Sequence, residues 1–289
     1  MIVFRGPDGR LRAGWRLVSF VVGLGAVSTA ATLMLRRLVG PVPGSPAVAL
    51  ALKGMLAAGV ASFTVFLARR LLDRRSIGSI GLRKEGAAAD FAFGFCISAA
   101  IVGGLVALLA RVGWARVEIA RLSAGQLVLL FWGTAAAVAW WEELVFRGYV
   151  LQNLEDGLGL RLAVLVSCLL YGIAHAFNPG ATLLSAVVIA GIGFVRILGY
   201  LTTRQLWLSM GMHAGWNFVQ SVVFGLPVSG RSTASWLATR LDGPAWVTGG
   251  SFGLEGGLGG VVYSLLSVGA ILAWTRRARA RRWPSCGSR

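Results

Sequence analysis

The chain has 289 residues, of which 56% are apolar and only 13% are charged, whereas soluble domains carry about 25% charged residues. With a mean hydropathy of +0.72, this composition excludes an ordinary soluble enzyme and a disordered chain. The formal net charge of +17 does not indicate nucleic-acid binding, because the basic residues recur between apolar blocks and form no single patch. Three cysteines without a Cys-x-x-Cys pair predict neither a disulfide framework nor a zinc site.

Apolar blocks of about 20 residues, the length that crosses a bilayer core, recur along the chain. They predict an all-α polytopic membrane protein with about eight transmembrane helices around a central catalytic bundle, in one integral membrane domain over residues 1–289. No internal repeat supports an inverted-repeat transporter. The blocks cover residues 15–35, 47–68, 91–110, 127–141, 160–177, 182–198, 205–224 and 258–274.

Arginine and lysine predict the orientation, because short cytoplasmic connections are enriched in them. They crowd the second connection and the C-terminal tail, and Arg147 and Arg196 count on the same side. With an even number of spans, both termini are then cytoplasmic, and we expect the membrane to be a bacterial or archaeal plasma membrane. The loop 225–257 is then external, and three aromatic residues are its expected interface anchors: Trp236, Trp246 and Phe252.

Ionisable groups inside apolar blocks are costly, so each is a functional hypothesis. Of 11 acidic residues, Glu142 and Glu143 are the pair that lies within such a block. The two histidines of the chain, His175 and His213, also lie in apolar segments. A lone histidine in a helix usually has a structural role. Here both histidines of the chain and a carboxylate pair lie in apolar segments, and this combination favours a catalytic site.

Helical spacing assigns different surroundings to the two glutamates. Glu143 and Arg147 are four residues apart, so they share a helix face and are expected to form an ion pair. Glu142 points about 100° away, which leaves it available for chemistry. The same four-residue spacing recurs in two further polar stripes, Tyr171 with His175 and His213 with Asn217.

A turn is expected at residues 155–159, Glu-Asp-Gly-Leu-Gly, where glycine interrupts the helical pattern. An antiparallel helical hairpin closed by this turn places Glu142 opposite His175. The free carboxylate and the first histidine are therefore expected to face each other.

A buried carboxylate beside a neutral imidazole can act as general base toward water. A second histidine with an amide one turn away can hydrogen-bond the oxyanion that forms on a carbonyl. This pattern predicts hydrolysis of amide or ester bonds. Water is the expected nucleophile, since no Ser or Cys has a matching base. Glu142, His175 and His213 could equally form a two-histidine, one-carboxylate metal site, and spacing alone leaves the metal undecided.

Together the three stripes resemble the CAAX protease and bacteriocin-processing (CPBP) family of intramembrane endopeptidases, and are similar to type II CAAX prenyl endopeptidases. That family carries Glu-Glu-x-x-x-Arg, Phe-x-x-x-His and His-x-x-x-Asn on successive helices of an eight-span fold. The motif-bearing core here is residues 124–224. Tyr171 in place of Phe is the one departure, and it adds a hydroxyl.

The resemblance implies cleavage, within the membrane, of a membrane-associated protein or peptide, which in eukaryotic relatives is prenylated. Partners are then this substrate and the lipid bilayer, with no nucleic acid. Members have been described both as metalloproteases and as glutamate-dependent enzymes; we favour the form without a cofactor, with zinc as the alternative. The implied roles are water activation by Glu142 and His175, oxyanion stabilisation by His213 and Asn217, and support from Glu143, Arg147 and Tyr171.

Two other functions compete with proteolysis. A proton-coupled transporter could use Glu142 and the histidines as a relay, but relay groups usually spread across the membrane depth. A non-catalytic immunity or scaffold protein would not need competent residues at every catalytic position.

Overall fold

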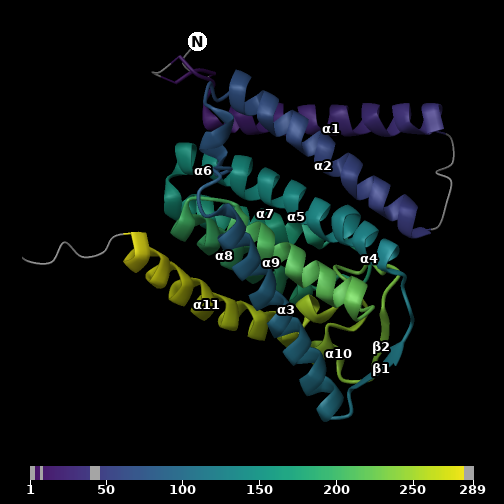
Figure 1. The fold of residues 1–289 in the computed structure, drawn as a ribbon. Helices are drawn as coiled ribbons and strands as arrows, with labels where there is room; N and C mark the ends of the chain where they lie inside the picture. The colour runs from purple at the N-terminus through teal and green to yellow at the C-terminus, as the bar shows by residue number, and fades with distance from the viewer. Residues whose placement is uncertain (1–3, 7–8, 40–45, 283–289) are drawn as a thin grey trace, which may run out of the picture.

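The computed structural model describes residues 4–6, 9–39 and 46–282. Its long apolar runs form helices, because a helix satisfies the backbone polar groups internally, as a bilayer requires. Figure 1 shows these helices side by side with a small ribbon of strands at one end. The helices are α1 (Ala13–Val39), α2 (Pro46–Leu71), α3 (Ala87–Arg111), α4 (Ala124–Leu130), α5 (Ala137–Glu143), α6 (Leu151–Leu158), α7 (Leu160–His175), α8 (Leu183–Thr203), α9 (Trp207–Asn217), α10 (Ala245–Thr248) and α11 (Leu258–Arg282).

Helices occupy each of the eight predicted ranges, and the all-α membrane fold is confirmed. Among the described residues, six helices are long and apolar enough to cross a membrane, and α7 is apolar but shorter. The span from Ala124 to Leu158 is one continuous 35-residue helix. Within it, π-helical turns η2 (Phe131–Ala136) and η3 (Leu144–Val150) separate α4, α5 and α6.

The helices differ in how deeply they lie in the bundle. In Figure 1, α1 lies at the edge beside α2, and only 6% of its apolar window is buried. Helix α9, in contrast, is buried from Leu208 to Asn217 and continues into a further π-helical turn, η4 (Phe218–Val223). The predicted span 205–224 is therefore an interior helix surrounded by its neighbours.

Close packing of α9 against α3 depends on glycines that face the partner backbone. A Cβ atom added at Gly211 would collide with the carbonyl of Phe91, and one at Gly215 with that of Phe95. Glycines four residues apart let membrane helices approach until their backbones touch. This contact fixes the height and rotation of α9, which carries His213 and Asn217.

The loop 225–257 folds back on the bundle. Its strand β2 (Leu237–Leu241) pairs antiparallel with β1 (Ala115–Ile119), the strand before α4. The buried Glu255 accepts hydrogen bonds from the Gln220 side chain and the Ser229 amide. Burial raises the pKa of the Glu255 carboxyl, and the Gln220 hydrogen bond opposes that rise.

Of the three expected interface anchors, one is wrong. Phe252 is 1% exposed and packs in the core with residues of α8 and α11. Trp236 and Trp246 are exposed, at 48% and 62%, as anchors would be. The short apolar turns around Phe252 bury its ring because the loop covers the end of the bundle.

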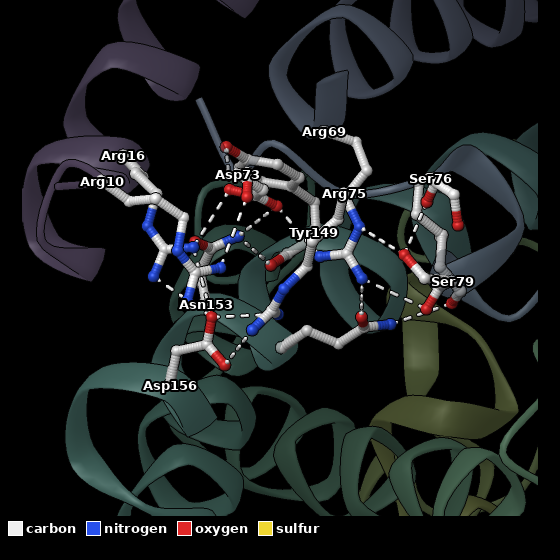
Figure 2. Close-up of polar contacts among 12 residues, drawn as sticks. Arg10, Arg16, Arg69, Asp73, Arg75, Ser76, Ser79, Tyr149, Asn153 and Asp156 are labelled. Carbon is white, nitrogen blue, oxygen red and sulfur yellow. Dashed lines mark hydrogen bonds and ion pairs between the residues drawn. The ribbon is translucent and has the colours of Figure 1, made fainter. Parts of the chain in front are cut away.

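A buried ionic network joins α1, α2 and α6, and we name it the anchoring cluster (Figure 2). Asp73 lies at its centre, 3.2 Å from a guanidinium nitrogen of Arg16 and 2.9 Å from one of Arg69. Arg16 also pairs with Asp156 at 3.1 Å. The other members are Arg75, Tyr149, Gln152 and Asn153.

Two arginines that the sequence analysis counted on the cytoplasmic side lie elsewhere in the structure. Arg147 and Arg196 are 1% and 3% exposed and lie inside the bundle. They neutralise a buried carboxylate and carry no information about which loops are cytoplasmic. They do not support the predicted orientation, whereas the exposed basic residues of the second connection do.

Candidate active site

The first polar stripe lies at the junction of α5 and η3. Glu142 and Glu143 are the last two residues of α5, and Arg147 is in the π-helical turn that follows. A π turn inserts an extra residue into the helical repeat and is frequent at functional sites. The stripe is buried: Glu142 is 8% exposed, and Glu143 is fully buried.

Glu143 is the hub of a network that we name the glutamate cluster: Glu142, Glu143, Arg147, Arg196 and His213. Its Oε1 accepts from guanidinium nitrogens of Arg147 at 3.3 Å and Arg196 at 3.1 Å. Nδ1 of His213 lies 2.9 Å from the same oxygen. The ion pair predicted from the spacing of Glu143 and Arg147 is confirmed.

Sequence reasoning missed the role of Arg196. This residue lies in α8, 53 positions after Glu143, and its backbone carbonyl also accepts from Ser209 of α9 at 2.7 Å. An arginine in the middle of an apolar helix is a costly residue, and that signal was present in the sequence. Its partner could not be inferred, because no spacing rule links α8 to α5.

Glu142 makes fewer hydrogen bonds and ion pairs than Glu143. Its Oε2 accepts a hydrogen bond from the Tyr171 hydroxyl at 2.9 Å and lies 3.9 Å from Nε2 of His213. Its Oε1 has no hydrogen-bond partner among the described residues, and its side chain is 10% exposed. Glu142 is therefore the carboxylate of this pair with an oxygen open to a water molecule.

His175 does not face Glu142 directly, so the predicted register is wrong by one helical turn. Tyr171 occupies the place opposite Glu142, and among the described residues no hydrogen bond or ion pair joins Glu142 to His175. The π turn η3 advances less per residue than an α-helix, which brings Glu142 closer to the hairpin turn. Its partner is accordingly a residue nearer that turn.

The imidazole of His175 nevertheless lies at the edge of the site. Its ring centroid is 4.4 Å from that of Tyr171, and its Nδ1 is 2.9 Å from the Tyr171 carbonyl oxygen. A carbonyl can only accept, so Nδ1 carries the proton in a neutral ring. Nε2 then offers a lone pair and, within the part of the chain that the structure describes, has no partner.

His213 and Asn217 lie one turn apart on α9, as predicted. Two guanidinium groups keep Glu143 ionised, and a carboxylate only accepts, so Nδ1 of His213 carries a proton. The Asn217 side-chain amide makes no hydrogen bond with any described residue; the Ser221 hydroxyl donates to the Asn217 backbone carbonyl. An amide without a protein partner in a buried site is suited to bind a substrate oxygen.

The alternative metal site has no assembled ligand set. Among the described residues, no three His, Cys, Asp or Glu side chains are grouped so that they could hold a metal ion. Of the three predicted zinc ligands, Glu142 and His213 are neighbours, whereas the His175 side chain hydrogen-bonds to a backbone carbonyl. In the described part of the chain, the three predicted zinc ligands are therefore not gathered into one group.

Residues 124–219 match the family model described as type II CAAX prenyl endopeptidase Rce1-like. The matched segment is about a third of the chain, and it contains all three polar stripes. Comparison with curated proteins and with solved structures gave no match. The family match confirms the resemblance inferred from the stripes. Together with the six apolar helices, it indicates a CAAX-protease-like hydrolase embedded in a membrane.

Proposed function

We propose that this chain is an intramembrane endopeptidase that hydrolyses a peptide bond of a membrane-associated protein or peptide. The observation that carries the proposal is the asymmetry of the glutamate pair. Glu143 is paired with Arg147 and Arg196, whereas Glu142 keeps an oxygen without a partner among the described residues. Such an oxygen can take a proton from water, which is the first requirement of hydrolysis.

In the proposed reaction, Oε1 of Glu142 removes a proton from a water molecule while the water oxygen attacks the scissile carbonyl carbon. Nε2 of His175, which offers a lone pair, accepts a hydrogen bond from the second hydrogen of the water and so orients the nucleophile. Glu142 then returns the proton to the leaving nitrogen as the carbon–nitrogen bond breaks. The products are a carboxylic acid and an amine, and both carboxylates end in their starting state.

The carbonyl oxygen becomes negative during the attack, and two groups on α9 are proposed to stabilise it. Asn217 donates from its side-chain amide. His213 donates from Nε2 only when its ring carries a second proton, since Nδ1 already donates to Glu143. This role requires that the ring carry both protons before the attack, because the proton removed from water stays on Glu142 until it passes to the leaving nitrogen. Nε2 of His213 lies 3.9 Å from Oε2 of Glu142.

The compactness of the cluster favours catalysis over proton transport. Glu142, Glu143 and His213 lie within direct contact distance of one another, through pairs at 2.9 Å and 3.9 Å. A relay needs groups at successive depths of the membrane. The described ionisable groups of the site converge on one position, which suits a single bond-breaking event.

We further propose that both termini are cytoplasmic, on the basis of the arginine-rich second connection. Cysteine labelling in intact cells tests this orientation. A cysteine at position 279 should be protected from a membrane-impermeant reagent, and one at position 233 should react. The reverse pattern would contradict the orientation and leave the proposed chemistry unaffected.

A cleavage assay in proteoliposomes tests the function itself. The substrates are membrane peptides of matched sequence, with and without a prenyl group on a cysteine near the C-terminus. We expect the wild-type protein to cleave at least one of them, and Glu142→Gln to cleave none. Cleavage of the prenylated form alone would assign the substrate class. Turnover by Glu142→Gln close to wild type would refute the assignment of the base.

A further inference from the structure

We propose that Tyr171 is a positioning residue for Glu142, and that its hydroxyl determines which carboxylate oxygen receives the proton from water. This inference rests on the proposed function and deepens it. Tyr171 holds Oε2, so that Oε1 is the oxygen presented to the nucleophilic water.

The first support is that the two carboxylate oxygens of Glu142 differ in their hydrogen-bond partners. The Tyr171 hydroxyl donates to Oε2 at 2.9 Å, and His213 lies on the same oxygen at 3.9 Å. Oε1 has no partner among the described residues. Without the hydroxyl, the carboxylate could rotate about its terminal bond, because torsions of this kind are broad and nearly two-fold. One fixed oxygen removes that freedom.

The second support is the rigidity of the ring that carries the hydroxyl. Tyr171 is 3% exposed. The Arg147 guanidinium lies over its ring at 4.3 Å from the centroid, and Phe146 meets the ring edge-to-face at 5.0 Å. A Cβ atom added at Gly193 would lie 3.2 Å from the ring. The ring therefore has little space to turn.

Arg147 connects the Tyr171–Glu142 hydrogen bond to the rest of the glutamate cluster. Its guanidinium pairs with Glu143 at 3.3 Å, and the same group lies on the face of Tyr171. A cation on the ring face draws electron density from the phenol, which makes the hydroxyl a stronger donor. The charged partner of Glu143 thus also strengthens the hydrogen bond that fixes Glu142.

The third support comes from the sequence pattern. Tyr171 is the one position where the three motifs depart from those they resemble, which have Phe. The change Tyr171→Phe therefore removes the hydroxyl and keeps a ring that this position accommodates. It is the least disruptive way to test the hydrogen bond.

The experiment measures kcat and KM in proteoliposomes and, separately, the infrared carboxylate band that disappears in Glu142→Gln. For Tyr171→Phe we expect kcat to fall about 10- to 100-fold, as loss of a hydrogen bond to a charged group predicts, with KM within about twofold. We also expect the Glu142 band to shift, because the band reports the hydrogen bond whether or not a substrate is cleaved.

Tyr149→Phe is the matched control. The Tyr149 hydroxyl also donates to a buried carboxylate, that of Asp73 at 3.3 Å, in the anchoring cluster. We expect this variant to lower the melting temperature and to leave kcat and the Glu142 band unchanged. A purely structural role for Tyr171 would make the two variants behave alike.

Each outcome decides the proposal. An unchanged Glu142 band in Tyr171→Phe would show that the hydrogen bond does not form. A shifted band with wild-type kcat would show that it forms without positioning the base. If the wild-type protein cleaves no peptide, the proposed function fails, while the band still reports whether Tyr171 holds Glu142.

Discussion

Two buried clusters of arginines and carboxylates lie in this bundle, and they differ in how fully the carboxylates are used. In the anchoring cluster, Oδ1 of Asp73 accepts from Arg16 and Tyr149, and Oδ2 accepts from Arg69 and Asn153. In the glutamate cluster, Oε1 of Glu142 has no partner among the described residues, and Oε2 of Glu143 is buried without one.

The difference separates a structural network from a reactive one. A buried carboxylate with every lone pair satisfied holds helices together and has no capacity left for a substrate. A carboxylate that is fixed on one side and open on the other retains such capacity, at a cost in stability that its neighbours must offset. Paired substitutions, one in each cluster, therefore test whether the two networks differ in this way.

The largest expected effect is the loss of catalysis in Glu142→Gln. Removal of the general base should lower turnover by at least about 10⁴-fold, as loss of a central catalytic residue does. The melting temperature should remain near wild type, because Gln still offers an acceptor to Tyr171. Peptide cleavage and thermal unfolding in detergent measure the two effects.

Asp73→Asn is the counterpart in the anchoring cluster. We expect a lower melting temperature and unchanged turnover per folded molecule. Lost turnover with normal stability in Asp73→Asn would remove the distinction between the clusters.

The next effect concerns the hub of the glutamate cluster. Glu143→Ala leaves the guanidinium groups of Arg147 and Arg196 buried without their partner, and Arg147→Ala weakens the same network. Each should destabilise the fold by about 3–5 kcal/mol and also reduce activity, because His213 loses its orientation. Urea or thermal unfolding checks the stability, and the cleavage assay checks the activity.

Arg69→Ala provides the comparison, since Arg69 pairs with Asp73 at 2.9 Å in the anchoring cluster. A similar loss of stability is expected there, with activity retained. Unchanged melting temperatures in Glu143→Ala and Arg147→Ala would contradict the importance of the buried pair.

A smaller effect is expected at Asn217. Removal of one oxyanion donor typically costs 10²–10³ in turnover, so Asn217→Ala should be slow and still measurable. Asn153→Ala removes a buried amide from the anchoring cluster, where it donates to Asp73 at 3.4 Å, and should alter stability alone. Wild-type turnover in Asn217→Ala would exclude its role as an oxyanion donor.

The smallest expected effect is none. Exhaustive chelation should leave activity intact, because the proposed steps use only Glu142, His175, His213 and Asn217. Metal analysis of the purified protein, with activity measured before and after chelation, provides the check. Stoichiometric zinc, with activity lost on chelation and restored by added zinc, would replace this mechanism with a metal-dependent one.

Local rules predicted much of this architecture. Apolar length located the eight helical segments, since backbone satisfaction in a bilayer depends on local sequence. Four-residue spacing predicted the contact between Glu143 and Arg147, because both residues lie on one helix. Contacts between helices were harder to predict. The π turn η3 altered the register of α6 and α7, and the pairing of Arg196 with Glu143 depends on tertiary packing.

Composition also misled where burial decides the role of a residue. Phe252 has the chemistry of an interface anchor, yet the folded loop buries it. Arg147 has the charge of a topology signal, yet it pairs with a carboxylate inside the bundle. Residue type alone does not distinguish these cases, because both depend on what packs around the side chain.

The pairing of β1 with β2 also has a consequence for the order of biosynthesis. Ile119 pairs with Leu237, and the ribosome synthesises the whole motif-bearing core after β1 and before β2. At about 5–20 residues per second, β1 stays unpaired for roughly 6–24 s. An unpaired strand invites wrong pairing, and charged residues on an edge oppose it. Arg116 and Glu118, exposed in β1, are suited to keep the strand soluble until its partner emerges.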